Sequence, residues 1–390
     1  MDFDLSPDDL AFRDELRAWL SAHSPPDIDV AADFGQAEAL RQWQRTLHEG
    51  RWVGIHWPAE YGGRGASLVQ VAIYNEELAR AQAPQILGRA GVNLVGPTLI
   101  AHGTEAQRQR WLQRILSAED IWCQLFSEPG AGSDLAGLTT KAVKDGDTYR
   151  VTGQKVWTSY ATFAAYGIAL VRTDPDAPKH RGISMLAIPM DVPGVDIRPL
   201  RQITGESEFN EVFFDEAPVP AGNLIGEPND GWRVAGTTLA NERGTSFVWK
   251  EQVLHEVARD MLWRRALDGG LAGDPLVRQK LAQSWMDVEV FRLHNLRTLT
   301  RLSRGEPIGA ESSVVKLVWT QTTQRLYEMA GEIFGPEALV MPGDDNALDR
   351  GRWARGILWS RASSIAGGTS EIQHNIIAER ILGLPREPAG

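Results

Sequence analysis

Two short stretches organise this chain: FSEPGAGSD at residues 126–134 and GQKVWTS at residues 153–159. The glycines of the first stretch lack a side chain, so nearby backbone N–H groups can come close to an anion or to the edge of a heteroaromatic ring. Its two serines add hydroxyl groups. Taken alone, the glycine-rich segment is more typical of a plain turn, and the segment around Trp157 of the end of a strand. Because of its glycines and serines, the first stretch is nevertheless a candidate cofactor loop.

Together, the two stretches resemble the flavin-binding signature of the acyl-CoA dehydrogenase family, and the resemblance extends from about residue 57 to residue 386. It implies an α+β fold with an N-terminal α-helical domain (residues 1–120), a middle β-barrel or sandwich domain (121–235) and a C-terminal four-helix bundle (236–390). It also implies FAD as cofactor. The implied reaction is α,β-dehydrogenation of an acyl-CoA thioester to the trans-2-enoyl-CoA.

Before about residue 121, apolar residues recur with a period near four, which predicts helices. After it they recur with a period of two, which predicts strands. Ser6 fits an N-cap with Pro7 at the first helical position. Ser370 and Gln373 fit a capping box at the start of a last helix. The predicted helices run from residue 7 to near residue 25 and over residues 37–49, 68–81, 93–102 and 105–117, and the predicted strands over 148–151, 168–172, 183–189 and 211–214.

The formal charge of −11, from 40 basic and 51 acidic residues, argues against nucleic acid or an anionic membrane as a main partner. The single cysteine, Cys123, excludes an intramolecular disulfide and fits a buried thiol in a reducing compartment. No apolar leader or long apolar span is visible, so we expect a soluble, untargeted, cytoplasmic protein. No metal site is predicted.

On the helix predicted after residue 231, Ala235, Leu239, Glu242 and Ser246 are spaced four, three and four apart and share one face. A carboxylate among small and apolar residues is costly to bury unless it is paired or used, and its pKa should be raised. By itself, this pattern is more typical of a salt bridge to a nearby arginine, or of a solvated position. The residues alone leave the role of Glu242 open.

Residues 365–373 resemble the C-terminal segment of the same family, where the common pattern places the catalytic glutamate at the position of Gly367. Glycine cannot abstract a proton. In the branch typified by isovaleryl-CoA and long-chain dehydrogenases, the glutamate instead precedes an arginine on an earlier helix, as Glu242 precedes Arg243 here. The resemblance therefore implies Glu242 as the base. It also implies that the N–H of Gly367 and the flavin ribityl 2′-hydroxyl donate to the thioester oxygen.

The resemblance also assigns roles around the flavin: the hydroxyls of Ser127 and Ser159 bond the isoalloxazine edge, and Trp157 packs beside the ring. Without it, Trp157 fits a plain core residue and Ser159 a strand-end hydroxyl. The implied FAD contacts are Phe126, Ser127, Gly132, Ser133, Trp157, Thr158, Ser159, Thr369 and Glu371, and the implied acyl-CoA contacts are Ser133, Arg243, Ala366 and Gly367.

Ala366 stands where the common family pattern has a tyrosine beside the acyl chain. The loss of an aromatic ring opens volume, which favours a bulky, branched or polycyclic acyl group such as a sterol side chain. Arg243 either steadies the CoA end or the active-site loop, or makes a surface ion pair. An electron-transferring flavoprotein is the implied electron acceptor.

Two segments depart from the pattern of homotetrameric relatives, in which a neighbouring subunit supplies Arg-x-x-Phe-Gly and Gln-x-x-Gly-Gly-x-Gly to the ADP half of the flavin. The first has no clear counterpart in residues 264–283, and the second reads EIFGPEA at residues 332–338, with a carboxylate where phosphate should lie. We therefore expect a tetramer, built either from copies of this chain or from this chain and a homologous partner. The second arrangement follows from the altered segments.

Other function classes remain open at this point. A flavin monooxygenase or oxidase of the same fold would need no base for an α-proton, and Glu242 with Ser127 and Ser159 favours the dehydrogenase. A DNA-associated relative would carry a basic face, which the charge does not suggest. A non-catalytic partner subunit would lack a base at both positions.

Overall fold

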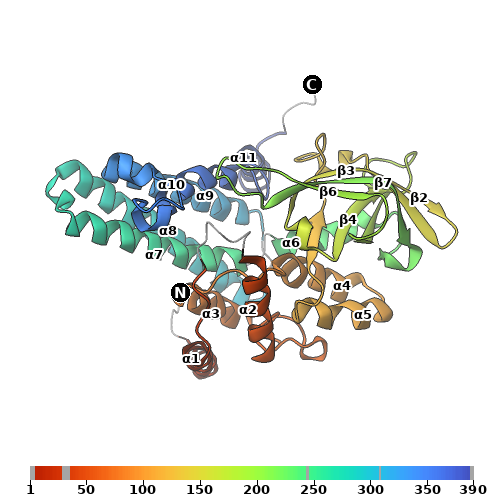
Figure 1. Ribbon diagram of the computed structural model, residues 1–390, viewed down its shortest axis with the longest axis horizontal. Coiled ribbons are helices and arrows are strands. Elements are labelled where there is room, and N and C mark those ends of the chain that lie inside the picture. Colours follow the sequence, from red (N-terminus) through yellow and green to blue (C-terminus); the bar gives the residue numbers. More distant parts are fainter. Residues whose placement is uncertain (1–4, 29–35, 243–245, 307–308, 387–390) are drawn as a thin grey trace. The chain divides into compact units, whose positions relative to one another are not determined.

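The computed structural model describes residues 5–28, 36–242, 246–306 and 309–386, and for Glu242 and residues 246–248 it describes the backbone alone. The chain divides into two compact units. Helices make up most of the first unit, and the second unit contains the sheet (Figure 1). The first unit consists of Met1–Ala31, Ser67–Ala83 and Arg243–Gly390, and the second of Ala32–Ala66 and Pro84–Glu242.

The described part of the second unit contains one sheet of eight strands in the order β6-β7-β3-β2-β4-β5-β8, with β1 paired in parallel with β4. The sequences of β4 and β5 are nearly continuous apolar runs, because both faces of these strands are buried. The strands are β1 Trp122–Leu125, β2 Lys141–Asp145, β3 Thr148–Ser159, β4 Tyr166–Arg172, β5 Ile183–Pro189, β6 Val195–Pro199, β7 Phe209–Pro220 and β8 Leu224–Ile225.

The antiparallel pair of β3 and β7 is longer than the sequence pattern predicts. Residues 148–151 and 211–214 are only parts of these two strands, while the predicted strand 183–189 coincides with β5. The pairing of β3 with β7 shifts register between Val151 and Gly153 and again between Lys155 and Thr158. Each bulge interrupts the alternation on which strand prediction depends. β1, β2, β6 and β8 were not predicted.

The sheet encloses a core to which strands from both ends of the β region contribute. Its buried residues are Cys123, Leu125, Ala142, Tyr149, Val151, Ala161, Ala169, Val171, Leu186, Ile188, Met190, Val212, Phe214, Ala217 and Val219. Burial raises the pKa of the Cys123 thiol to about 12. The prediction of a buried, unpaired thiol is confirmed.

A local capping signal starts α5 of the second unit, and a tertiary contact constrains the start of α4. A capping box starts α5, because the Thr104 hydroxyl accepts from the Gln107 N–H (3.3 Å) and the Gln107 side chain accepts from the Thr104 N–H (3.0 Å). α4 begins at Gly96, where a Cβ would lie 1.8 Å from the ring of Trp57. Only glycine admits this ring. The helices are α2 Ala37–Glu49, α4 Gly96–His102, α5 Glu105–Leu116 and α6 Gly231–Glu242.

α6 packs against α4 and β5 of the same unit. Two side-chain hydrogen bonds join α6 to α4: Thr98 Oγ1 to Thr238 Oγ1 (2.8 Å), and His102 Nε2 to Thr237 Oγ1 (2.7 Å). These contacts fix the helix whose last residue is Glu242.

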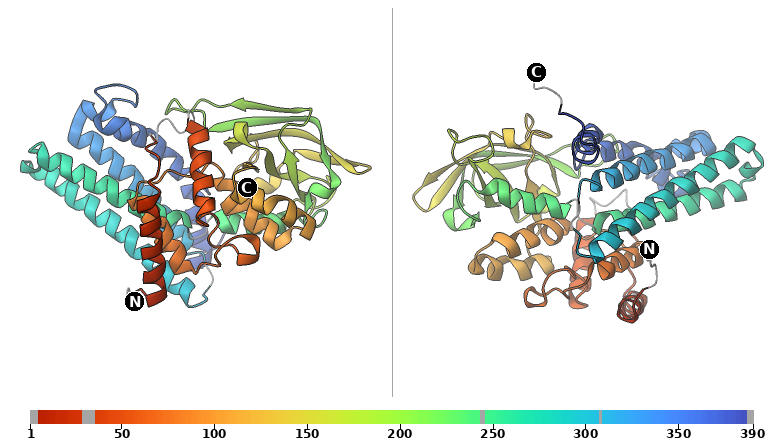
Figure 2. Two further views of the ribbon diagram at one scale, coloured as in Figure 1. Left: turned by 60° about the horizontal axis from the view of Figure 1, so that its bottom comes forward. Right: turned by 180° about the vertical axis from the view of Figure 1, so that it is seen from behind.

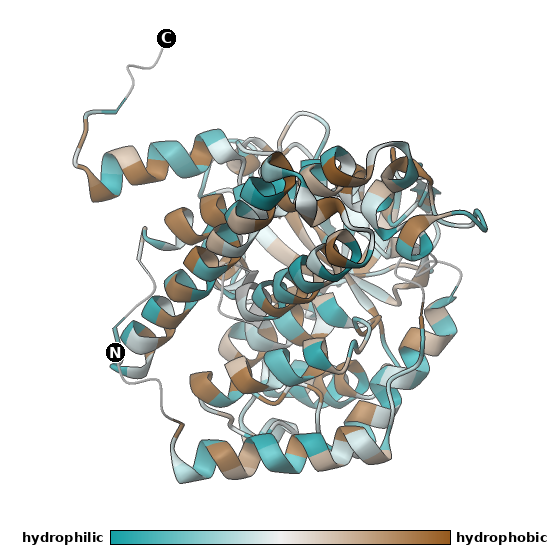
Figure 3. Cartoon of the chain, turned by 90° about the vertical axis from the view of Figure 1, so that its left-hand side faces the viewer, coloured by the Kyte–Doolittle hydropathy of each residue, from teal (hydrophilic) through white to brown (hydrophobic). Residues whose placement is uncertain are grey.

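The first unit is built around three long helices, α7, α8 and α9, which run side by side (Figure 2). Apolar and hydrophilic residues are mixed along the helices of the chain (Figure 3). α1 is joined to α3 by an ion pair between Arg17 Nε and Glu77 Oε2 (2.7 Å). The helices are α1 Pro7–Ala22, α3 Leu68–Arg80, α7 Ser246–Asp268, α8 Pro275–Ser303, α9 Ser312–Phe334, α10 Arg352–Trp359 and α11 Ser370–Ile376.

Helix starts determined by local caps agree with the sequence prediction, with one exception. The Ser6 hydroxyl accepts from the Asp9 N–H (3.2 Å) and Pro7 begins α1. The predicted N-cap Ser370 is wrong: it is the first residue of α11, and the N-cap is Thr369, whose hydroxyl accepts from the N–H of Ile372 (3.3 Å). Thr369 has the extended backbone that a capping residue needs.

The predicted helical face from Ala235 to Ser246 does not lie on one described helix. α6 ends at Glu242 and Ser246 is the first residue of α7, while residues 243–245 lie outside the described residues. Among the residues that the structure describes, no helix combines the length and apolar character that crossing a membrane requires.

Candidate active site

The glycine loop, residues 126–134, is fastened to the sheet by a buried ion pair. Lys155 Nζ donates to Glu128 Oε1 (2.8 Å) and to the carbonyl oxygen of Phe126 (3.0 Å). The second carboxylate oxygen of Glu128 accepts from the N–H of Thr139 (2.7 Å), and Oε1 also accepts from the N–H of Thr140 (3.0 Å). The loop therefore has a defined shape before any ligand binds.

Burial opposes the charge on both partners, and the pairing restores it. Burial alone would raise the pKa of Glu128, but the attraction of Lys155 and the hydrogen bonds from Thr139 and Thr140 lower it to about 2. Burial lowers the pKa of Lys155, while Glu128 raises it. The pair is ionised at neutral pH.

The tip of the glycine loop is open. Gly130 and Gly132 are exposed, and a Cβ added at either would meet no atom within 4 Å. Ser133 is also exposed. The N–H of Val156 donates to the Ser127 carbonyl (2.9 Å), which aligns the loop with the end of β3. The loop therefore leaves room for a group to approach its backbone.

The end of β3 carries the other predicted flavin contacts. The ring of Trp157 is 61% exposed, so Trp157 is not a core residue. Its φ is 60°, in the left-handed region that few large residues adopt, and its ring lies edge to face against Phe209 (centroids 6.1 Å apart). An exposed indole held on a strained backbone is typical of a binding surface.

Two half-buried hydroxyls are available at this wall. Ser127 and Ser159 have no side-chain hydrogen-bond partner in the described part of the chain. The Thr158 hydroxyl also has no partner there, but its side chain is buried. The carbonyl of Thr158 accepts from Asn210 Nδ2 (2.9 Å). Phe126 is buried as well and contributes its carbonyl to Lys155. Side-chain contacts to a ligand at this wall would come from Ser127, Trp157 and Ser159.

The C-terminal turn, residues 363–369, belongs to the first unit. Gly367 and Gly368 have φ of 65° and 91°, which glycine adopts without strain. Gln373 Nε2 donates to the carbonyls of Gly367 (3.3 Å) and Gly368 (3.1 Å). The N–H of Gly367 has no acceptor among the described residues, so it is free to donate to a ligand. Ala366 beside it is exposed.

Two further predicted residues lie at the start of α11. Thr369 is its N-cap, and Glu371 is exposed in its first turn. Hydrogen bonds from its own backbone N–H and from the Thr369 hydroxyl lower the pKa of Glu371. The hydroxyl of Thr369 is thus already used in capping the helix.

The predicted base lies at the limit of the described chain. Glu242 is the last residue of α6, and the structure describes only its backbone. Arg243 lies outside the described residues. Their roles stay predictions. No group of His, Cys, Asp and Glu suited to a metal ion occurs among the residues that the structure describes.

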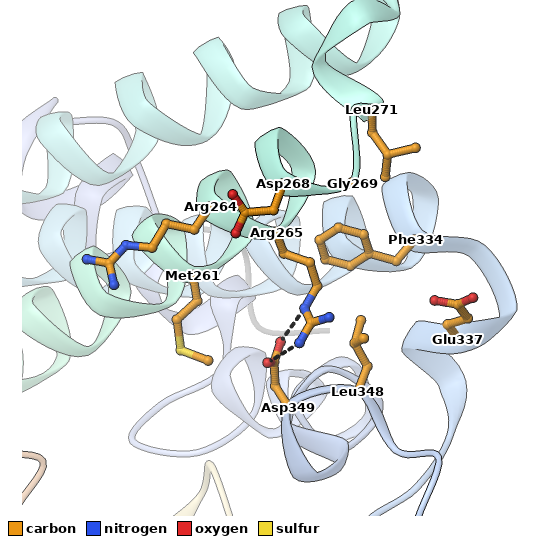
Figure 4. A pocket seen from close by; sticks show the side chains of 10 residues that line it. All are labelled: Met261, Arg264, Arg265, Asp268, Gly269, Leu271, Phe334, Glu337, Leu348 and Asp349. Atoms are coloured by element: carbon orange, nitrogen blue, oxygen red, sulfur yellow. Dashed lines mark hydrogen bonds and ion pairs between the residues drawn. The ribbon is translucent and has the colours of Figure 1, made fainter.

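A pocket of about 550 Å³ lies in the first unit, beside the end of α7 (Figure 4). It brings together the end of α7 and the segment after α9, the two regions that depart from the homotetramer pattern. Arg265 Nη2 forms an ion pair with Asp349 Oδ1 (2.7 Å). Its lining is Met261, Arg264, Arg265, Asp268, Gly269, Leu271, Phe334, Glu337, Leu348 and Asp349. With three carboxylates against two guanidinium groups, the pocket is a poor site for a phosphate.

Family models cover almost the whole chain. The N-terminal domain model of acyl-CoA dehydrogenase matches residues 6–119, the middle domain model residues 123–217 and the C-terminal domain model residues 229–382. The chain belongs to the acyl-CoA dehydrogenase family. The predicted family and three-part fold are confirmed, and the chain is an oxidoreductase acting on CH–CH groups. The predicted domain limits near residues 120 and 235 stay a prediction.

Individual members of the acyl-CoA dehydrogenase family are similar to this chain over nearly its whole length. The acyl-CoA dehydrogenase IpdE1 of Mycobacterium tuberculosis is 41% identical over 386 residues, covering 97% of this chain and 98% of the relative. The structure "Tcur3481-Tcur3483 steroid ACAD" has a TM-score of 0.90 at 31% identity and covers 99% of this chain and 100% of its own. The ChsE4-ChsE5 complex from M. tuberculosis has a TM-score of 0.87 at 32% identity, with coverage of 99% and 100%.

Sequence reasoning missed the residues that hold this acyl-CoA dehydrogenase site in shape. Glu128 and Lys155 were quoted within the two motifs, yet nothing in their spacing indicated that they pair. Gln373 was interpreted as a capping residue, while its amide binds two carbonyls of the C-terminal turn. The available signal for the ion pair was the presence of two acidic residues, Glu128 and Asp134, in the first motif and of one lysine, Lys155, in the second.

Proposed function

We propose that this protein catalyses the FAD-dependent α,β-dehydrogenation of a bulky, branched or polycyclic acyl-CoA thioester to the trans-2-enoyl-CoA, with Glu242 as the base. The observation that carries the proposal is Gly367, which leaves the common base position without a side chain on a left-handed backbone. A structural relative whose title reads "steroid ACAD", and the exposed Ala366, support a large acyl group.

The residues of the second unit fit a flavin. Open space above Gly130 and Gly132, the exposed ring of Trp157 and the unused hydroxyls of Ser127 and Ser159 supply the surfaces that an isoalloxazine ring and a pyrophosphate need. Bound there, FAD would supply the acceptor for the hydride that leaves the β-carbon. Phe126, Ser133 and Thr158, with Thr369 and Glu371, are the remaining proposed contacts.

Glu242 would take the α-proton of the thioester. A carboxylate in a water-poor environment is a stronger base than in water, and a well-positioned base contributes roughly 10²- to 10⁴-fold to the rate. Arg243, next to it, is proposed to steady the CoA end. Negative charge that develops on the thioester oxygen needs a preorganised donor, and the free N–H of Gly367 is suited to this role.

The protein is proposed to act in a tetramer with a homologous partner subunit. Two structural relatives, Tcur3481-Tcur3483 and ChsE4-ChsE5, carry two protein names in their titles. The pocket with Asp268 and Glu337 on its wall gives a second argument, because these carboxylates would repel the phosphates of a neighbouring subunit's FAD. An electron-transferring flavoprotein is the proposed acceptor.

The test is anaerobic bleaching of the flavin in the co-expressed complex on addition of a panel of acyl-CoAs that includes sterol side-chain thioesters. We expect wild type to bleach and Glu242→Gln to bleach at least about 10²-fold more slowly. Glu227→Gln, a change at an exposed carboxylate of the second unit, is the matched control. Bleaching that Glu242→Gln leaves unchanged would remove Glu242 from the mechanism.

Two further outcomes separate the alternatives. Bleaching by no acyl-CoA, with oxygen consumed in the presence of a separate reductant, would favour a monooxygenase or oxidase. An active homotetramer of this chain with one FAD per subunit would contradict the mixed assembly.

A further inference from the structure

Lys316 on α9 is a half-buried cation without a carboxylate partner among the described residues. Its ammonium donates to the carbonyl oxygen of Ser363 and to Thr320 Oγ1 (3.3 Å) and lies 5.0 Å from the ring centre of Trp319. Burial lowers the pKa of Lys316 to about 8. A lysine kept half-buried without a counter-charge costs free energy, so a compensating role is expected.

The partners of Lys316 lead into the C-terminal turn. The Ser363 carbonyl accepts from Thr320 Oγ1 (2.9 Å) as well as from Lys316, so α9 holds this carbonyl with two donors. Ser363 is buried, and the N–H groups of Ile365 (3.0 Å) and Ala366 (2.9 Å) after it both donate to the Ala362 carbonyl. The backbone is thus fixed up to the residue before Gly367.

Lys316 also reaches Gly367 itself. A Cβ at Gly367 would lie 3.9 Å from Lys316 Cε, so the lysine stem lies beside this glycine. Gln373 holds the carbonyls of Gly367 and Gly368 from α11. The C-terminal turn is therefore held by α9 and α11, and the N–H of Gly367 is left without an acceptor in the described chain.

We propose that Lys316 is a positioning residue for the dehydrogenation: it fixes the C-terminal turn through Ser363, so that the N–H of Gly367 points at the thioester oxygen, and it places a positive charge beside that N–H. The inference rests on the proposed function. A preorganised donor stabilises developing negative charge without reorganisation during the reaction, and a nearby cation adds to this effect.

The first test measures the turn itself, by hydrogen exchange in the FAD-loaded complex without substrate. In Lys316→Met we expect the amides of Ile365 and Ala366 to exchange about tenfold faster or more, because a hydrogen bond from a charged donor is lost. Lys316→Arg should restore most of the protection, and Thr320→Val should give a smaller increase. Lys280→Met, which removes a half-buried lysine of α8 that is ion-paired with Glu332, is the control.

The second test separates positioning from general damage. We expect Lys316→Met to slow flavin bleaching by about tenfold or more while the affinity for a CoA thioether, which lacks the carbonyl oxygen, stays at the wild-type value. The thioester should lose the affinity advantage that it has over the thioether in wild type.

Wild-type exchange at residues 365 and 366 together with a wild-type bleaching rate in Lys316→Met would overturn the inference. So would an equal loss of thioester and thioether binding, which indicates a purely structural role. If no acyl-CoA bleaches the wild-type flavin, the proposed function fails, and the exchange experiment still decides whether Lys316 holds the turn. Thr320→Val removes one hydroxyl and keeps the test possible if Lys316→Met does not fold.

Discussion

The glycine loop and the C-terminal turn are both held by a buried or half-buried lysine, but the two lysines are used differently. Lys155 is wholly buried and paired with Glu128, whose carboxylate is also hydrogen-bonded to Thr139 and Thr140. Lys316 is half-buried, and among the described residues its ammonium is hydrogen-bonded only to a carbonyl and a hydroxyl. The carboxylate of Glu128 compensates the positive charge of Lys155 inside the fold. The positive charge of Lys316 is not compensated in this way and can act on a ligand. Lys155 thus holds the shape of the glycine loop. Lys316 holds the shape of the C-terminal turn and also leaves a positive charge near it.

The largest expected effect comes from breaking the compensated pair. Glu128→Gln leaves the Lys155 ammonium buried without a counter-charge, so we expect a loss of about 3–5 kcal/mol in the free energy of unfolding at pH 7. Chemical denaturation of the isolated chain measures it. Glu128→Gln combined with Lys155→Met should recover most of the loss, since both buried charges are removed. A loss below about 1 kcal/mol for the single variant would contradict the description of this pair.

Acid should weaken the same pair. The pKa of Glu128 is about 2 in the folded protein, against the ordinary value of about 4.5 for a glutamate. A carboxyl group with a lowered folded pKa contributes fully above the unfolded value, and its contribution is lost as the pH falls from about 4.5 to about 2. We expect on the order of 2–3 kcal/mol to be lost over this range in wild type. Stability curves for Glu128→Gln should be flatter there by that amount, and parallel curves would argue against the lowered pKa.

A smaller effect is expected at the C-terminal turn from Gly367→Ala. The added Cβ meets only ordinary contact with Lys316 Cε at 3.9 Å, so the cost comes from the left-handed backbone at φ 65°. This amounts to about 1 kcal/mol in the free energy of unfolding. Thermal unfolding compared with Gly130→Ala, at an exposed glycine with open space and no positive φ, isolates the backbone contribution. Equal costs at the two positions would contradict it.

The smallest stability effect should come from Lys316→Met. The half-buried ammonium has no carboxylate partner in the part of the chain that the structure describes. Replacing it by an apolar side chain removes its desolvation cost along with two hydrogen bonds, so the net change in the free energy of unfolding should stay within about 1 kcal/mol. Denaturation of this variant beside Glu128→Gln gives the direct contrast between the two lysines. A loss as large as that of Glu128→Gln would mean that Lys316, like Lys155, serves stability alone.

Two helix starts followed from sequence because they depend on neighbours along the chain. The N-cap of α1 and the capping box of α5 are encoded within four residues. The prediction for Ser370 failed by one position, because Thr369 and Ser370 are both capping residues in sequence and only the backbone distinguishes them. The bulges of β3 could not be predicted from the sequence, because they depend on how β3 pairs with β7. The exposure of Trp157 depends on the same pairing.

The sequence by itself determined the family, the order of helical and β regions, the glycine loop and the absence of a side chain at position 367, since these depend on residue types at fixed spacing. Only the tertiary structure decided that Lys155 pairs with Glu128, 27 positions away, and that Lys316 reaches Ser363, 47 positions away. A charged residue in a sequence carries no record of its partner. Its pairing and its solvation arise when distant segments pack together, and here they separate a lysine that stabilises the fold from one that is proposed to serve the reaction.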